Sequence, residues 1–102
     1  MSAGFRAEVE IEFKPSDNGG LRVAVERGNR SLLYQFTGLG PEDDEVVTFG
    51  AVVDDVTAGG PPGTTMTGWL WFWVELAEVY ATPATTFEVW HAGRIVGHGT
   101  VL

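Results

Sequence analysis

Six residues near the end of the chain have types that could bind a phosphate or a metal ion. They are His91, Gly93, Arg94, Gly97, His98 and Gly99. Glycine-rich loops bind phosphate through backbone N–H groups at the start of a helix, and neutral imidazoles are common metal ligands. A third interpretation is that the glycines serve only the turn and the bend of a β-hairpin.

The residues around these glycines favour the hairpin. A phosphate loop opens onto a helix, and no helical pattern follows Gly99. For the turn WHAGR at 90–94 we expect a type I turn with a glycine bulge at Gly93, because Ala92 disfavours the positive φ that a type I′ turn needs. On the last strand a bulky neighbour or a sharp bend would explain two glycines on one face. The predicted structural hairpin residues are Gly93, Arg94, Gly97 and Gly99.

No metal site is expected. In this hairpin His98 lies opposite Thr86 or Phe87, which places it roughly 15 Å from His91 at about 3.3 Å per residue. The chain has no cysteine, so thiolate sites and disulfides are excluded. The carboxylates at 42–45 and 54–55 lack the spacing of a calcium loop.

No catalytic site is expected either. Catalysis needs a nucleophile or an acid–base pair with an orienting partner, and Ser2, Ser16 and Ser31 have no such neighbours in the sequence. The chain also lacks a glycine-rich loop with a lysine, which excludes nucleotide chemistry of that type. We therefore expect a protein that is not an enzyme and that needs no cofactor.

The elements that carry these residues follow a period of two, which is typical of β-strands. From Phe5 to Lys14 apolar and polar residues alternate strictly. Further strands are expected at 21–26, 31–36, 46–53, 68–80, 86–91 and 94–102. The last part of 68–80 also fits a helical stripe, but its run of aromatics favours a strand. Six or seven close strands predict a small antiparallel barrel or sandwich in a single domain, residues 1–102.

Composition limits the classes of partner. The formal net charge is −8, from 14 acidic and 6 basic residues, and a field of that sign repels nucleic acid and attracts basic partners. The first residues do not have the pattern of a signal peptide. The longest apolar run, 69–74, is far shorter than the roughly 20 residues of a membrane helix. We expect a cytoplasmic protein without membrane association.

A second candidate site is the tryptophan-rich strand. Trp69, Trp71 and Trp73 alternate with Leu70 and Phe72, so both faces of this strand are apolar. If the leucine–phenylalanine face enters the core, the tryptophans line the outside, and a contiguous aromatic patch is typical of an interface. That predicts a protein partner or self-association. Alternatively both faces are covered within the monomer, by the Gly/Pro-rich loop 54–65 or by barrel curvature.

The closing stretch FEVWHAGRIVGHGTV, 87–101, resembles the closing hairpin of the third domain of elongation factor Tu. In that family a phenylalanine leads into a Gly-Gly-Arg turn, and a Val-Gly-x-Gly strand follows. The matching residues here are Phe87, Gly93, Arg94, Val96, Gly97 and Gly99, with Ala92 in place of the first turn glycine. FRAEVE at 5–10 resembles the family's opening strand. RGNRSLLYQF at 27–36 resembles its Lys-Gly-Tyr-Arg-Pro segment, where Gly28 and Arg30 match.

The resemblance implies a six-stranded antiparallel β-barrel of the elongation factor Tu domain 3 type. In the full factor this domain helps to hold aminoacyl-tRNA and contacts the GTPase domain, so the implied function is binding. The main hypothesis is a binding module for a protein partner. The alternative is RNA (tRNA) binding through Arg22, Arg27 and Arg30, the only basic concentration in the sequence, although a net charge of −8 opposes it.

Overall fold

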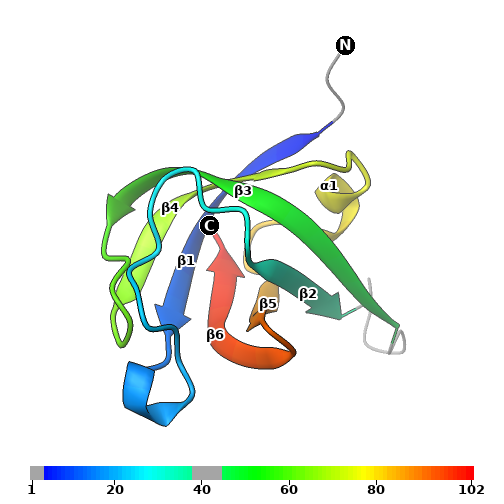
Figure 1. Ribbon diagram of the computed structural model, residues 1–102. Coiled ribbons are helices and arrows are strands. Elements are labelled where there is room, and N and C mark those ends of the chain that lie inside the picture. Colours follow the sequence, from blue (N-terminus) through cyan, green and yellow to red (C-terminus); the bar gives the residue numbers. More distant parts are fainter. Residues whose placement is uncertain (1–3, 38–44) are drawn as a thin grey trace.

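The structure, a computed structural model, describes residues 4–37 and 45–102 and contains a closed antiparallel barrel. Its strands are β1 (Phe5–Phe13), β2 (Leu33–Thr37), β3 (Val46–Ala58), β4 (Thr65–Phe72), β5 (Thr86–His91) and β6 (Arg94–Val101). Around the barrel they follow the order β1-β4-β3-β2-β5-β6, and β6 pairs again with β1 (Figure 1). The expected all-β class is confirmed, and the architecture is a six-stranded barrel rather than a sandwich.

Alternate residues of the strands fill the barrel. In β4 the side chains of Leu70 and Phe72 are fully buried, which confirms that this face of the strand enters the core. Aromatic rings meet edge-to-face in the interior, with centroids of Tyr34 and Phe72 5.8 Å apart. The rings of Tyr34 and Phe87 are 5.9 Å apart in the same way. The period of two therefore sorts apolar residues inward, and it leaves the outward residues free to carry other properties.

The prediction that the tryptophan-rich strand runs to Tyr80 is wrong. β4 ends at Phe72, which pairs with Phe5, the first residue of β1, so β1 offers no further partner. The chain then turns, and the short helix α1 (Ala77–Tyr80) follows. Without a β1 partner beyond Phe72, the helix formers of this stretch form the short helix instead of a longer strand.

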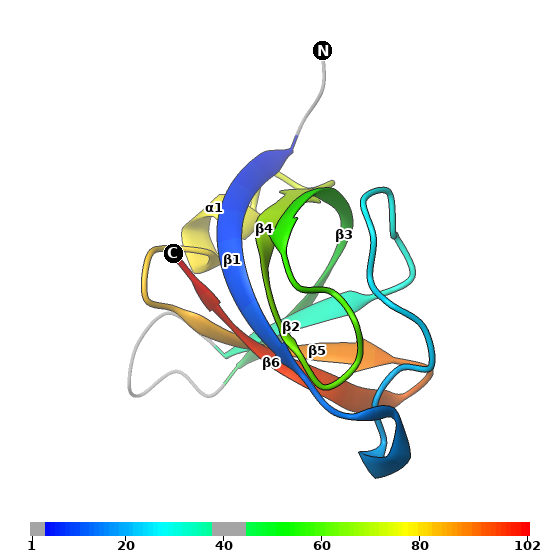
Figure 2. The same cartoon turned by 90° about the vertical axis from the view of Figure 1, so that its left-hand side faces the viewer.

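The predicted strand at 21–26 is also absent. β1 and β2 are not neighbours in the barrel, so the chain between them travels along its side, as Figure 2 shows. A 3₁₀ turn, η1 (Ser16–Asn18), opens this connection. Leu21 and Val25 are buried while Val23 is 70% exposed. The apolar residues alternate here because two of them, Leu21 and Val25, hold an irregular segment against the barrel. A hydrogen bond from the Val25 N–H to the Gly60 carbonyl, 2.8 Å long, helps to hold it there.

Strand β3 is longer than predicted and the following loop is shorter. β3 continues through Asp54 and Asp55 to Ala58, and irregularities in its pairing with β4 lie between Val53 and Asp55 and between Val56 and Ala58. Such bulges let a strand bend sharply without leaving its sheet. The Gly/Pro-rich loop is therefore confined to 59–64.

The β5–β6 hairpin differs from the expected turn type. Ala92 has φ 52° and Gly93 has φ 78°, which is the type I′ arrangement, and the strand pair closes at His91 and Arg94. A two-residue loop needs this turn because its twist matches that of the strands. That requirement outweighs the cost of a positive φ at alanine.

The bulge predicted in the turn lies instead within the strands. Trp90 pairs with Ile95 and Val89 pairs with Gly97, so Val96 is the additional residue. This shift of one position places His98 opposite Glu88, not opposite Thr86 or Phe87 as predicted. Of the two explanations for paired glycines, the bulky neighbour holds at Gly99, because a Cβ there would overlap the ring of Phe87.

Candidate functional site

The three tryptophans predicted as a partner site lie on the outside of the barrel. Trp69 and Trp71 are half-buried on β4, and Trp73 follows the strand with 46% of its surface exposed. The guanidinium carbon of Arg6 lies 4.1 Å from the centroid of the Trp69 ring. The Arg6 Nε donates to Asp54 Oδ2 at 2.7 Å, which orients the guanidinium over the indole.

The other two indoles are also covered in part by the chain's own residues. Trp71 packs against Gly4, and Trp73 packs against Gly50, where in each case a Cβ would overlap the ring. The guanidinium carbon of Arg30 lies 6.0 Å from the Trp73 ring. The covering groups are thus arginines and glycines that lie far away in the sequence, which sequence reasoning did not find. The interface role of the three tryptophans stays a prediction.

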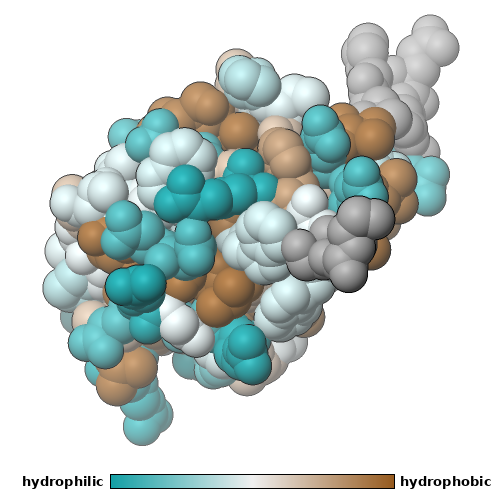
Figure 3. Space-filling view, turned by 90° about the horizontal axis from the view of Figure 1, so that it is seen from above, coloured by the Kyte–Doolittle hydropathy of each residue, from teal (hydrophilic) through white to brown (hydrophobic). Residues whose placement is uncertain are grey.

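The segment after β4 presents the larger exposed apolar surface, which we call the apolar shoulder. It consists of Trp73, Val74, Leu76 and Val79, whose side chains are between 46% and 56% exposed. Sequence reasoning missed the last three because it placed them in a strand. In Figure 3, which looks down on the molecule from above, hydrophobic residues form separate groups among hydrophilic ones.

The apolar shoulder is anchored from below. The side chains of Ala77 and Ala81 are buried, and the ring of Tyr80 lies 5.6 Å from the ring of Phe49 in β3. Successive backbone hydrogen bonds hold the segment in turns, including one from the Ala77 N–H to the Val74 carbonyl at 3.1 Å. The exposed side chains therefore stand on a fixed backbone.

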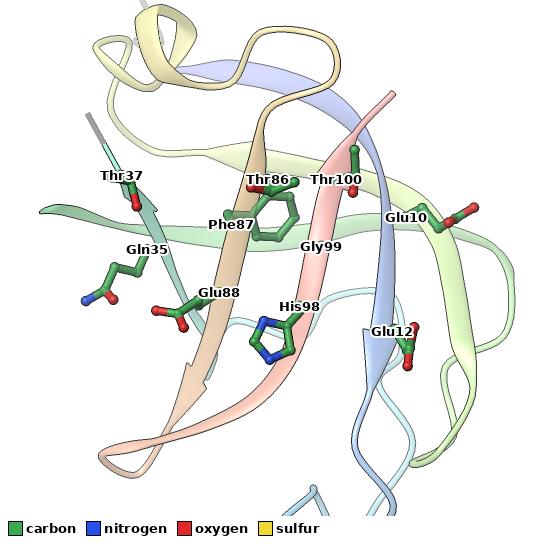
Figure 4. Close-up of a pocket in the computed structure, with 10 residues that line it drawn as sticks. All are labelled: Glu10, Glu12, Gln35, Thr37, Thr86, Phe87, Glu88, His98, Gly99 and Thr100. Atoms are coloured by element: carbon green, nitrogen blue, oxygen red, sulfur yellow. The ribbon is translucent and has the colours of Figure 1, made fainter. Parts of the chain in front are cut away.

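A second outward surface, the polar groove, crosses β1, β6, β5 and β2 and encloses about 370 Å³. Its lining residues are Glu10, Glu12, Gln35, Thr37, Thr86, Phe87, Glu88, His98, Gly99 and Thr100. Strand register sets them in rows, and Figure 4 shows His98 between Glu88 of β5 and Glu12 of β1. The groove offers many hydrogen-bond acceptors and carboxylate charge to solvent.

Metal-binding arrangements are absent from the described ranges. Within 4–37 and 45–102, no group of three or more His, Asp or Glu side chains has the geometry to hold a metal ion. Of the carboxylates at 54–55, which the sequence had already shown to lack calcium-loop spacing, Asp54 pairs with Arg6, and Asp55 Oδ1 accepts from the Val56 N–H at 3.0 Å. Residues 42–44 lie outside the described residues.

The three arginines of the RNA alternative lie along the connection between β1 and β2. Arg22 lines a hollow together with His91 and Arg94 of the β5–β6 hairpin, whereas Arg30 approaches Trp73. Arg27, which lies between them in the sequence, is exposed. Arg22 therefore lines the same hollow as Arg94, a residue that the sequence placed in the structural hairpin.

None of the helices in the described part of the chain is long and apolar enough to cross a membrane. Comparison with models of known protein families and with curated proteins finds no match to this chain. The likeness to the third domain of elongation factor Tu thus rests on the quoted motifs and stays a prediction.

Proposed function

We propose that this protein is a non-catalytic binding module whose interface with a protein partner is the apolar shoulder, with the adjoining tryptophans. One observation carries the proposal. Among the described residues, eight large hydrophobic side chains are exposed, and four of them lie between Trp73 and Val79. Such a concentration of exposed apolar side chains is typical of interaction sites, whereas single exposed ones need no explanation.

The anchoring of the shoulder supports this function. Ordering a mobile segment on binding costs free energy, which a fixed backbone avoids. Here the buried side chains of Ala77 and Ala81 and the contact between the rings of Tyr80 and Phe49 hold the segment before any partner arrives. Trp73 supplies an aromatic anchor of the kind that dominates binding energy in interfaces.

The charge of the chain specifies the partner. Glu75 and Glu78 are exposed within the shoulder, and the net charge is −8. In a two-fold dimer the same surfaces meet, so each copy would bring these two carboxylates into one interface, where the four like charges would repel one another. The partner that fits is a different protein, with an apolar surface bordered by lysine or arginine.

The resemblance to an elongation factor domain supports binding rather than catalysis but does not specify tRNA. Arg30 approaches the Trp73 ring, and 14 acidic residues oppose every phosphate contact. RNA binding through Arg22, Arg27 and Arg30 is the less supported alternative. A tRNA titration separates the two functions, since only RNA binding would appear at low salt and weaken steeply as salt rises.

The test is site-specific photo-crosslinking in the source cells, followed by binding of the purified partner. A photoreactive amino acid at Val79 should capture a protein that the same group at Glu88, in the polar groove, does not. Leu76→Ser should then weaken binding of the purified partner by about ten-fold or more. Leu33→Ser is the matched control, because Leu33 has a similar exposure of 47% on β2. Equal capture from both positions, or equal effects of both variants, would contradict the proposal.

A further inference from the structure

Beside the tip of the β5–β6 hairpin, basic side chains gather around one hollow, which we call the basic notch. It is lined by Leu21, Arg22, Val23, His91, Ala92 and Arg94, and its volume is about 370 Å³. None of these residues is acidic. In a chain with 14 acidic and 6 basic residues, two arginines around a hollow without a carboxylate reverse the local charge.

One hydrogen bond joins the two walls of the basic notch, and a second one holds the connection itself. Arg94 Nη2 donates to the Gly20 carbonyl at 3.4 Å, which links β6 to the β1–β2 connection. Ser16 Oγ donates to the carbonyl of Leu21 at 2.6 Å, and the side chain of Leu21 is buried. These bonds hold the connection where it faces the hairpin.

The guanidinium donors in the notch are mostly unused. A guanidinium carries five N–H donors. Within the described ranges Arg22 has no hydrogen bond or ion pair, and the side chain of Arg94 bonds only to the Gly20 carbonyl. Arg6 is different, since Asp54 neutralises it. The notch thus keeps two cationic forks available for an anion.

One wall of the notch is apolar. Val23 is 70% exposed, more than any other large hydrophobic side chain that the structure describes. Ala92 faces the same hollow from the hairpin turn. An apolar group beside two guanidinium forks suits a ligand that has both an anionic head and a small hydrophobic body.

We propose that the basic notch binds a small oxyanion ligand, a carboxylate or phosphate group attached to a short apolar group. Arg22 and Arg94 bind the oxyanion, because the planar guanidinium matches carboxylate and phosphate geometry. Val23 contacts the apolar group. The volume lies within the range of small-molecule sites, about 300–1,000 Å³. The notch shares no residue with the apolar shoulder, so this inference goes beyond the proposed function.

The first experiment uses three probes of similar shape, 3-methylbutanoate, 3-methylbutyl phosphate and the neutral 3-methylbutanamide. Each is titrated into the ¹⁵N-labelled protein, and the amide signals of Val23, Ala92 and Gly93 are followed. At least one anion should bind saturably, with a dissociation constant on the order of 1 mM for a probe of this size. If the carboxylate binds more tightly, the natural ligand is a peptide C-terminus or a carboxylic-acid metabolite. If the phosphate binds more tightly, the natural ligand is a phosphorylated metabolite. The neutral amide should bind at least ten-fold more weakly.

Variants show whether the two arginines are responsible. Arg22→Gln and Arg94→Gln should each weaken anion binding by roughly ten-fold, as expected for a charged hydrogen bond. Arg27→Gln removes the same charge outside the notch and should leave the dissociation constant unchanged. The proposal is overturned if no anion saturates these signals or if the neutral amide binds equally well. It is also overturned if Arg27→Gln weakens binding as much as Arg22→Gln, because the effect would then be one of net charge.

Discussion

The tryptophan-bearing side of the barrel and the polar groove are built on the same alternation but have opposite outer surfaces. On β4 the outward residues are indoles, each partly covered by residues of the same chain, such as Arg6 and Gly50. On β1, β6 and β5 the outward residues include Glu12, His98 and Glu88, which stay open to solvent around a hollow. The interior is apolar behind both.

The difference shows what each level of structure determines. Alternation fixes which residues face inward, and it places no constraint on outward chemistry. Whether an outward residue is covered depends on residues far away in sequence, as Arg6 and Asp54 show, 48 positions apart but paired beside Trp69. A surface's function therefore depends on register between strands, which alternation alone does not specify.

The largest expected effect compares two glycines that lie under aromatic rings. A Cβ at Gly99 would overlap the ring of Phe87, and a Cβ at Gly50 would overlap the ring of Trp73. Phe87 is 3% exposed and packed inside the barrel, whereas Trp73 is 46% exposed and can move into solvent. Gly99→Ala should lower the free energy of unfolding by about 2–3 kcal/mol, the cost of overpacking a core.

Gly50→Ala serves as the counterpart of that variant. It should cost less than about 1 kcal/mol, since surface changes seldom exceed that, and it should shift tryptophan fluorescence to longer wavelength as the Trp73 ring is displaced. Urea denaturation measures both free energies. Equal losses in the two variants would mean that Trp73 is held as firmly as a core ring, and the distinction between covered and buried aromatics would fail.

The interior and the candidate sites differ in how far the sequence could predict them. The strict alternation from Phe5 to Lys14 was sufficient to predict which side of that strand enters the core, whereas around Leu70 and Phe72 both faces are apolar and the choice stayed open. The end of β4 was not predictable locally, because it depends on where β1 begins to pair. For the same reason the apolar shoulder was misassigned to a strand.

The polar groove and the basic notch could not be predicted from the sequence either, because both depend on how distant segments are placed against each other. His98 faces Glu88 only because a bulge at Val96 shifts the register by one residue. Arg22 and Arg94 line one hollow only because an irregular connection passes the hairpin tip. No local sequence pattern predicts the bulge or the path of the connection. The sequence therefore assigned different roles to residues that lie side by side in the fold.

A change of intermediate size in the free energy of unfolding is expected for a substitution in the interior, behind both surfaces. The hydroxyl of Tyr34 is buried and has no hydrogen-bond partner within the described structure. Leaving a polar group buried and unpaired is costly, so Tyr34→Phe should raise the free energy of unfolding by roughly 1 kcal/mol. Thermal or urea denaturation at neutral pH tests this. A loss of stability instead would show that the hydroxyl has a partner, such as a buried water.

The same residue predicts a pH dependence. Burial raises the pKa of Tyr34 far above its ordinary value of about 10. A folded-state pKa above the unfolded one gives stability that is complete below about pH 10 and is lost as the pH rises further, because only the unfolded chain then releases the proton. The wild-type protein should therefore lose stability above pH 10 more steeply than Tyr34→Phe. Parallel curves would rule out a buried, neutral phenol.

The smallest effects compare one carboxylate from each outer surface. Asp54→Asn removes the partner of Arg6 beside Trp69 and should lower the free energy of unfolding by about 0.5 kcal/mol, as for an exposed ion pair. Glu10→Gln removes the same charge from the polar groove. Glu10 faces Thr67 and Thr100 on the neighbouring strands, and Glu8 and Glu12 flank it on the same side of β1. Glu10→Gln should therefore raise stability by a few tenths of a kcal/mol, because it relieves repulsion in a chain of net charge −8.

Salt distinguishes these electrostatic effects from changes in packing. At about 1 M sodium chloride the screening length falls to ~3 Å, so both differences from the wild-type protein should shrink toward zero. The two variants have the same net charge, and opposite signs at low salt would therefore locate the effect in the surroundings of each carboxylate. If both variants changed stability in the same direction, net charge alone would explain the result, and the two outer surfaces would be electrostatically equivalent.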